Sequence, residues 1–308
     1  MSNLAWNPVL PGVPHPVPAA PALRRWSSPR NILVVFNGRN EDMLLFHTVV
    51  QARQSGARVV LAYLAGQGSE EQQRAAADRV KQRLHWVGVH CQSTILWNPA
   101  EVSVPSLAAR SGADRVLIVT QGEKLPGGLS LSNVAERLLP LLRIPVCVIG
   151  NAVPPPPNCA VPAKRISLAL SLQSRNEMAL RFACELCRDW NAALTVVHVF
   201  PKQELPGQRL PRTPNAVSSE LPGWIRRKTP VSCPLEIAIR SGDPAHEIVA
   251  HAAKTHQDLI LMCSPGRENV RGLLDAGVLK AVLSEAPCPV LVTGRGLEQE
   301  HGSLTETG

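Results

Sequence analysis

The chain has 308 residues, of which 44% are hydrophobic and 18% are charged. This composition is sufficient for a buried core and excludes a globally disordered protein. The formal net charge is +8, but aromatic residues make up only 4% of the chain. Proteins that bind single-stranded nucleic acid stack its bases on aromatic side chains, so nucleic acid is not an expected partner.

The sequence shows neither the long apolar run of a membrane-spanning helix nor the pattern of a secretory signal. No apolar run approaches the roughly 18 residues of a membrane-spanning helix, and prolines interrupt the N-terminal residues where a secretory signal would need an apolar stretch. Eight cysteines in 308 residues is well below the density of a disulfide-rich secreted domain. We therefore expect a cytoplasmic protein with no membrane contact and with reduced thiols, although one disulfide is compatible with the sequence.

The N-terminal part of the chain predicts an arm followed by alternating strands and helices. Residues 1–30 contain seven prolines and three arginines without an acidic residue, which is typical of a flexible or draped arm. In residues 31–150, the β-branched apolar run Ile32–Phe36 predicts a strand buried on both faces. The elements predicted after it are a helix at Asp42–Ser55, a strand at Val59–Leu64, a helix at Glu70–Val87, a strand at Ser93–Trp97, a helix capped by Asn98, a strand at Val116–Val119, a helix at Asn133–Leu142 and a strand at Val146–Ile149.

The rest of the chain predicts a linker and a second unit. Residues 151–163 contain a run of four prolines that favours stiff polyproline II structure. Residues 164–294 return to alternating strands and helices, and residues 295–308 form a tail. An insertion at 201–234 holds seven prolines and the basic cluster Arg226-Arg227-Lys228. It is either a solvated or disordered loop, or a patch that binds an anion or a protein partner.

An internal repeat links the two units. The segments Leu138–Ile149 and Val282–Thr293 end alike and lie 144 positions apart. Asn98-Pro99-Ala100 corresponds to Asp243-Pro244-Ala245 at an offset larger by one, and both predict a helix start. We therefore predict one α/β module written twice, with a separate parallel sheet in each copy and helices on both faces of the sheet.

The ends of the first and fourth strands are the expected binding region, because ligands of such sheets bind at the carboxyl ends of the strands. In each copy a glycine follows the fourth strand, then nine residues lead to a helix start. These positions are Gly122 with Ser132-Asn133, and Gly266 with Ala276-Gly277. Glycine amides and helix N-termini are the backbone donors that phosphate needs. The alternative is that both glycines serve only as turn residues.

These features together resemble the universal stress protein family in a tandem form. The resemblance covers 31–150 and 165–294, and it depends most on Ser132–Arg137, Ser241–Ala245 and Ala286–Val292. It implies two Rossmann-like, doubly wound domains, each with a five-stranded parallel sheet of order 3-2-1-4-5. It also implies a cytoplasmic stress-response role and, in a subset of members, ATP binding through G-x2-G-x9-G-[S/T] with an aspartate after the first strand.

Neither copy keeps that full motif. Val119 and Cys263 stand where the first glycine belongs. Asn37 replaces the aspartate in copy one, and Ser171 replaces it in copy two. Tyr63 falls at the position expected near the adenine, where it either stacks on a base or fills the pocket. The expected function is therefore binding and regulation without clear catalysis, and the alternative is an ATP or adenine-nucleotide sensor with slow hydrolysis.

The remaining cysteine and histidine patterns do not predict a redox or metal site. Cys184-x-x-Cys187 lies on an apolar helical pattern and is interpreted as core thiols, with no second pair at zinc-ligand spacing. His246, His251 and His256 are spaced by five, which puts them on different helix faces, so no metal site is expected. His198 is interpreted as a core histidine.

The expected partners follow from the same resemblance. It implies that the fifth strands, Val146–Ile149 and Val290–Thr293, meet at the contact between the two domains. A homodimer and a protein partner at 201–234 are further hypotheses.

Overall fold

The computed structural model describes residues 28–66, 69–120, 131–155, 162–170, 177–200, 214–229, 233–263 and 276–293. We call the described residues up to 155 the first half and those from 162 the second half. The first half contains β1 (Asn31–Phe36), α1 (Glu41–Ser55), β2 (Arg58–Leu64), α2 (Glu70–Trp86), β3 (Cys91–Leu96), α3 (Ala100–Ser111), β4 (Arg115–Val119), α4 (Leu131–Leu138) and β5 (Val146–Ile149). The second half contains β6 (Arg165–Ala169), α5 (Glu177–Trp190), β7 (Ala193–Phe200), α6 (Pro214–Lys228), β8 (Leu235–Ser241), α7 (Pro244–Lys254), β9 (Leu259–Cys263), α8 (Ala276–Glu285) and β10 (Val290–Thr293).

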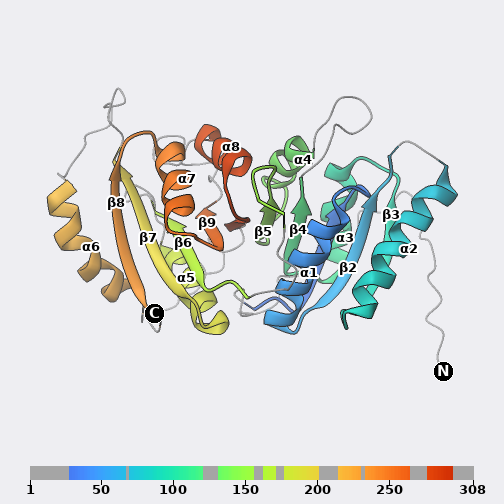
Figure 1. Ribbon diagram of the computed structural model, residues 1–308, viewed down its shortest axis with the longest axis horizontal. Helices are drawn as coiled ribbons and strands as arrows, with labels where there is room; N and C mark the ends of the chain where they lie inside the picture. The colour runs from blue at the N-terminus through green and yellow to red at the C-terminus, as the bar shows by residue number, and fades with distance from the viewer. Residues whose placement is uncertain are drawn as a thin grey trace, which may run out of the picture.

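All ten strands belong to one sheet, in the order β3-β2-β1-β4-β5-β10-β9-β6-β7-β8. Strands within each half pair in parallel, whereas β5 and β10 pair antiparallel with Leu291 opposite Cys147. The two strands that the resemblance places at the contact between the halves, β5 and β10, are therefore neighbours, and through them the five strands of each half join into one sheet. Read outward from β5 and from β10, the two halves have mirrored strand orders (Figure 1).

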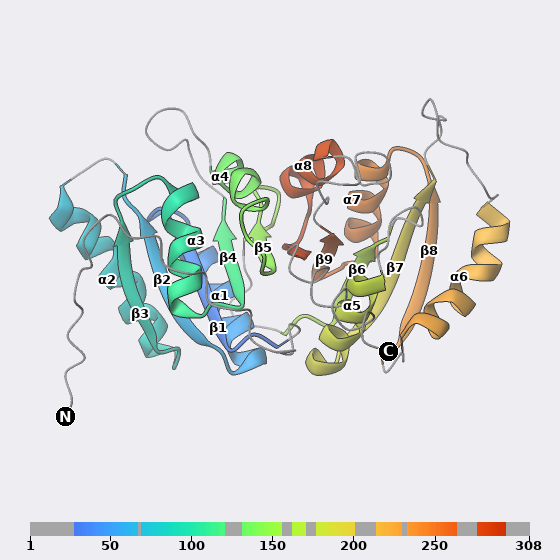
Figure 2. The ribbon, with the colours of Figure 1, turned by 180° about the vertical axis from the view of Figure 1, so that it is seen from behind.

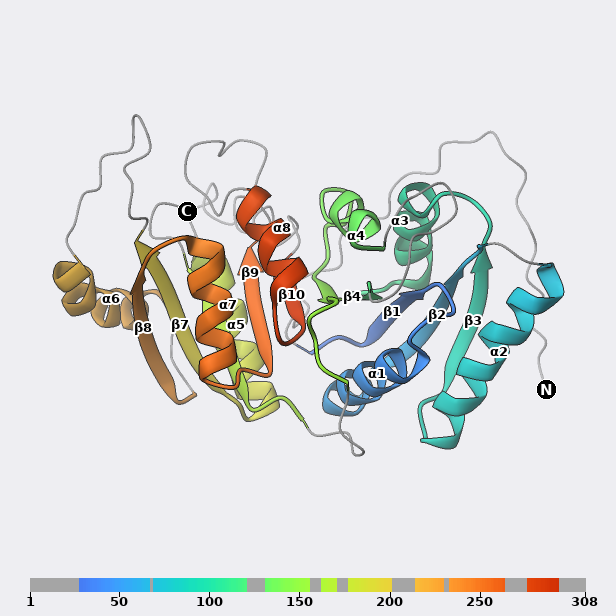
Figure 3. The same cartoon turned by 45° about the horizontal axis from the view of Figure 1, so that its top comes forward.

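The helices cover both faces of the sheet, and alternate strand residues divide between two cores. Ile32, Val34 and Phe36 face a core that also includes residues of α1, α2, α5 and α6. Leu33 and Val35 face the other core, with residues of α3, α4, α7 and α8. Each core includes residues from both halves. Figure 3 shows the helices packed along the sheet. Burial on both faces explains why central strands such as β1 and β4 are nearly continuous apolar runs, whereas the edge strands β3 and β8 include polar residues.

The sequence predicts a side-chain cap at the start of α7 and of α3. The structure contains the first of these caps but not the second. Asp243 caps α7 by accepting a hydrogen bond from the backbone N–H of His246 (2.9 Å), with Pro244 in the first turn. The predicted cap at Asn98 is wrong, because Pro99 occupies the cap position of α3 and no side chain caps the helix. The Asn98 carbonyl instead accepts a hydrogen bond from the Ser103 hydroxyl (3.0 Å).

Part of the predicted insertion is helical. Residues 214–228 form α6, which lies between β7 and β8 in chain order, where α2 lies between β2 and β3. Leu221 and Ile225 of α6 are buried in the core shared with α5, so a solvated or disordered loop is the wrong interpretation for this stretch. The basic cluster 226–228 is exposed in its last turn, where cations interact favourably with the helix dipole. Among the described helices, none is long and apolar enough to cross a membrane.

Side chains also join the halves away from the strand pairing. Arg115 of β4 is fully buried, and its guanidinium carbon lies 5.7 Å from the ring centroid of Trp190 on α5. The Arg115 side chain also donates to the Gln51 side-chain carbonyl at 3.5 Å. A desolvated cation over an indole ring is worth about 2 kcal/mol.

We expect Arg115→Met to lower the free energy of unfolding by about 2 kcal/mol, because methionine keeps most of the stem volume but loses the cation. Urea unfolding of the full chain measures this change. Arg58→Met is the matched control, since Arg58 is exposed on β2 of the same sheet, and it should change stability by less than about 0.5 kcal/mol. Additive effects of Arg115→Met and Trp190→Leu would contradict a direct interaction between the two side chains.

Candidate functional site

The candidate site lies at the carboxyl ends of the strands, where the chain leaves β1. Gly38 and Asn40 both have left-handed backbone conformations, with φ of 80° and 50°, which return the chain into α1. Asn37 is half-buried at the start of this turn, and its side-chain oxygen accepts a hydrogen bond from the Arg39 backbone N–H at 3.3 Å. The residue that replaces the family aspartate therefore already stabilises its own loop.

Tyr63 closes the space beside this turn. Its side chain is 7% exposed and packs edge-on against Phe36, with ring centroids 5.0 Å apart. A Cβ placed on Gly38 would lie 2.7 Å from the Tyr63 hydroxyl oxygen, so the ring is packed directly over the glycine. Burial raises the pKa of the Tyr63 hydroxyl, which is therefore neutral at physiological pH. Of the two interpretations of Tyr63, this packing favours a ring that fills the pocket.

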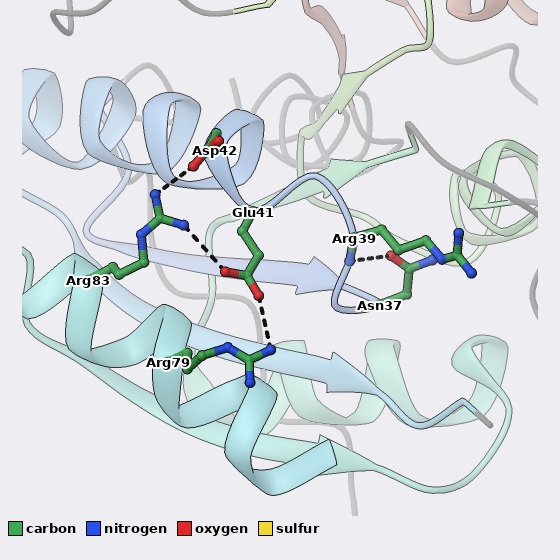
Figure 4. Close-up of polar contacts among 6 residues, drawn as sticks. All are labelled: Asn37, Arg39, Glu41, Asp42, Arg79 and Arg83. Carbon is green, nitrogen blue, oxygen red and sulfur yellow. Dashed lines mark hydrogen bonds and ion pairs between the residues drawn. The ribbon is translucent and has the colours of Figure 1, made fainter. Parts of the chain in front are cut away.

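An ion-pair network borders the same region (Figure 4). Glu41 in the first turn of α1 pairs with Arg83 at 3.3 Å and with Arg79 at 3.6 Å, both from α2. Arg83 also pairs with Asp42 at 2.5 Å. These hydrogen bonds raise the pKa of Arg83 further. The network fixes the start of α1 against α2, and an incoming phosphate would compete with carboxylates already bound to both arginines.

The structure places the other predicted site residues only in part. Gly122, Ser171 and Gly266 lie outside the described residues. Ser132 and Asn133 lie in the first turn of α4, of which the backbone is described. Ala276 and Gly277 are the first two residues of α8. Both helix starts follow the fourth strand of their half, as predicted.

Thr120, which sequence reasoning missed, follows β4 directly. It is buried, and both its backbone N–H and its hydroxyl donate to the Ile149 carbonyl, at 2.9 and 3.0 Å. The hydroxyl is therefore used to join β4 to β5 rather than presented to a ligand. A hydroxyl residue at the end of a buried strand was the available signal.

In the second half, His198 lies where Tyr63 lies in the first. Tyr63 pairs with Phe36 at the end of β1, and His198 follows Val197, which pairs with Ala169 at the end of β6. The His198 Nδ1 lies 2.8 Å from the Leu170 carbonyl oxygen, and burial lowers the pKa of the ring. Because a carbonyl only accepts, the neutral ring carries its proton on Nδ1. The interpretation as a core histidine fits this placement, and the strand register was the signal for its correspondence with Tyr63.

Two other features lie away from the candidate site. His251 of α7 is buried, and its Nδ1 lies 3.2 Å from the Arg240 guanidinium of β8; burial and the nearby cation lower its pKa. Among the described residues, no group of three or more His, Cys, Asp or Glu side chains is arranged to hold a metal ion.

A hollow of about 290 Å³ lies along α2 from Asp78 to Trp86 and includes Cys91. Cys91 begins β3, so this hollow is at the amino end of the strand, opposite the candidate site.

Comparison by sequence finds one family model that matches within the second half. Residues 162–294 match the model of the Universal stress protein family. This range runs from just before β6 to just beyond β10. No curated protein sequence matches the chain.

Solved structures share the whole fold. A universal stress protein from Archaeoglobus fulgidus DSM 4304 has a TM-score of 0.62 and 15% identity, over 87% of this chain and 99% of that one. A functionally unknown protein from Pseudomonas aeruginosa PAO1 has a TM-score of 0.57 and 15% identity, over 92% and 99%. The cytoplasmic domain of a prokaryotic cation chloride cotransporter has a TM-score of 0.51 and 15% identity, over 89% and 98%. At this identity the similarity shows a common fold.

Proposed function

We propose that the chain is a tandem universal stress protein, with one family-type domain at 31–150 and another at 164–294 that share a single sheet. The observation that carries this proposal is the mirrored strand order on either side of the β5–β10 pair. The family match of 162–294 supports it for the second domain. The same strand order and the repeated sequence segments extend the proposal to the first domain.

The proposed role is binding and regulation in a stress response, without catalytic turnover. In the first domain, the Tyr63 ring is packed over Gly38 and the Asn37 side chain accepts from its own loop. Arg79 and Arg83 are paired with acidic side chains. We therefore propose that the first domain does not bind an adenine nucleotide and that its role in the molecule is to complete the shared sheet.

One observation favours the alternative, an adenine-nucleotide sensor, in the second domain alone. Gly277, the second residue of α8, is exposed. Without a Cβ it allows an anion to approach the helix start closely, where the backbone dipole favours negative charge. The Gly266 position precedes this helix in the sequence motif. Under this alternative, ATP binds only in the second domain.

Thermal unfolding of the full chain with and without Mg-ATP, together with mass spectrometry of any small molecule released on denaturation, tests these proposals. The binding and regulatory role without ATP predicts no retained nucleotide and a change in the unfolding midpoint of less than about 1 °C at millimolar ATP. The sensor predicts a stabilisation that Gly266→Val abolishes and that the matched variant Gly122→Val leaves intact. A stabilisation that only Gly122→Val abolishes would contradict the inactive first domain.

A further inference from the structure

Three cysteines from separate parts of the second half meet beside α5. Cys184 and Cys187 are one turn apart on α5, so their side chains lie on the same face of the helix. Cys233 lies two residues before β8, and side-chain hydrogen bonds join its sulfur to both α5 thiols. We call Cys184, Cys187 and Cys233 the three-thiol cluster. All three are free thiols.

The cluster is buried on one side and accessible on the other. Cys184 and Cys187 are 2% and 0% exposed, in the core that they share with Leu221 and Ile225 of α6. Cys233 is only partly buried and packs against the same core. Figure 2 shows α5 beneath β6 and β7, with α6 beyond β8. A small oxidant therefore reaches Cys233 before it reaches the thiols of α5.

The hydrogen bonds within the cluster favour ionisation of Cys233. Cys184 and Cys187 donate to the Cys233 sulfur, which lowers the pKa of Cys233, while burial and the same hydrogen bonds raise the pKa values of the two α5 thiols. The Thr229 hydroxyl, just after α6, also hydrogen bonds with Cys184. The thiolate is the reactive form of cysteine. The accessible member of the cluster is thus also the one whose ionisation the hydrogen bonds favour.

We propose that the three-thiol cluster is an oxidation site, at which Cys233 reacts with a hydroperoxide and then forms a disulfide with a thiol of α5. This inference does not depend on the proposed function. The disulfide joins α5 to the segment that enters β8 and closes a loop that contains α6.

The reaction balances in two steps. The Cys233 thiolate attacks one oxygen of the hydroperoxide, the S–O bond forms and the O–O bond breaks. The leaving alkoxide, or hydroxide from hydrogen peroxide, takes up the proton that Cys233 released, and Cys233 becomes a sulfenic acid. An α5 sulfur then attacks the Cys233 sulfur, the S–S bond forms, and the S–O bond breaks. Hydroxide leaves with the thiol proton as water, so two thiols are oxidised and one hydroperoxide is reduced.

Peptide mapping of the full chain tests the product. The reduced protein is treated with one equivalent of hydrogen peroxide, alkylated and digested with trypsin without reduction. We expect peptide 182–188, which contains both α5 cysteines, to be linked to peptide 229–240, with the third thiol alkylated. Cleavage after Glu185 then separates Cys184 from Cys187 and identifies the partner. A bond between Cys184 and Cys187 with Cys233 alkylated, or no disulfide at one equivalent, would overturn the proposal.

The pH dependence of alkylation tests the role of Cys233 without requiring a disulfide. Cys91 is the matched control, because it is also partly exposed but burial raises its pKa. Labelling of Cys91 by iodoacetamide should rise about tenfold per pH unit between pH 6 and 8, whereas labelling of Cys233 should change less than about threefold. Cys233→Ser should abolish the linked peptide and Cys91→Ser should preserve it. Parallel pH profiles for the two cysteines would contradict an activated Cys233.

Discussion

Replacing Gly150 with alanine is expected to lower the free energy of unfolding by about 3 kcal/mol, at the upper end of typical overpacking costs. Gly150 follows β5, and a Cβ at this position would lie 2.4 Å from the backbone carbonyl oxygen of Leu283 in α8. The backbone fixes the position of the Cβ, and the Leu283 oxygen belongs to the main chain, so no side-chain rotation can relieve the clash. The substitution therefore forces the first half away from the second beside the β5–β10 pair. Urea unfolding of the full chain measures the loss.

Gly66→Ala is the matched control for Gly150→Ala. A Cβ on Gly66 meets no atom within 4 Å, and its φ lies outside the left-handed range. Alanine there should change stability by less than about 0.5 kcal/mol. A Gly150→Ala protein as stable as the Gly66→Ala protein would contradict the close approach of the two halves.

Gly38→Ala has the second large expected effect, a loss of about 3 kcal/mol. The left-handed φ of 80° costs a non-glycine residue about 1–2 kcal/mol, and contact of the new Cβ with the Tyr63 hydroxyl, 2.7 Å away, adds about 1–2 kcal/mol. The buried tyrosine ring cannot move aside without disturbing Phe36. Chemical denaturation of the full-length variant measures the sum.

Two controls separate these contributions. Gly56 has a φ of 67° and open space around it, so Gly56→Ala should show the cost of the backbone conformation alone. In a Tyr63→Leu background the clash is removed, and the cost of Gly38→Ala should fall to that of Gly56→Ala. An unchanged cost in the Tyr63→Leu background would show that Tyr63 does not fill the turn.

The central strands were predictable because they are buried on both faces. The runs Ile32–Phe36 and Val290–Val292 are apolar at every position, which is a pattern that few other structures produce. Helix α6 was not predicted, because the prolines of 201–234 outweighed the apolar spacing of Leu221, Trp224 and Ile225. That spacing of three and four residues was the helical signal in the segment.

Contacts between distant segments were harder to predict. The resemblance implied that the fifth strands meet, but the antiparallel register that places Leu291 opposite Cys147 is reported by no local pattern. Likewise, the spacing of Cys184 and Cys187 predicts that they lie on one face of a helix. The position of Cys233 beside them depends on the path of the chain through α6 into β8, which the sequence does not indicate. The packing of Tyr63 over Gly38 requires the register of β1 with β2, and sequence alone left its role open.

The antiparallel pairing of β5 with β10 also restricts how the molecule can move. A hinge or shear between the halves, the usual route by which paired domains open and close, would break main-chain hydrogen bonds in the middle of a buried sheet. The β5–β10 pair therefore opposes relative motion of the two halves, because such motion would have to separate these two strands.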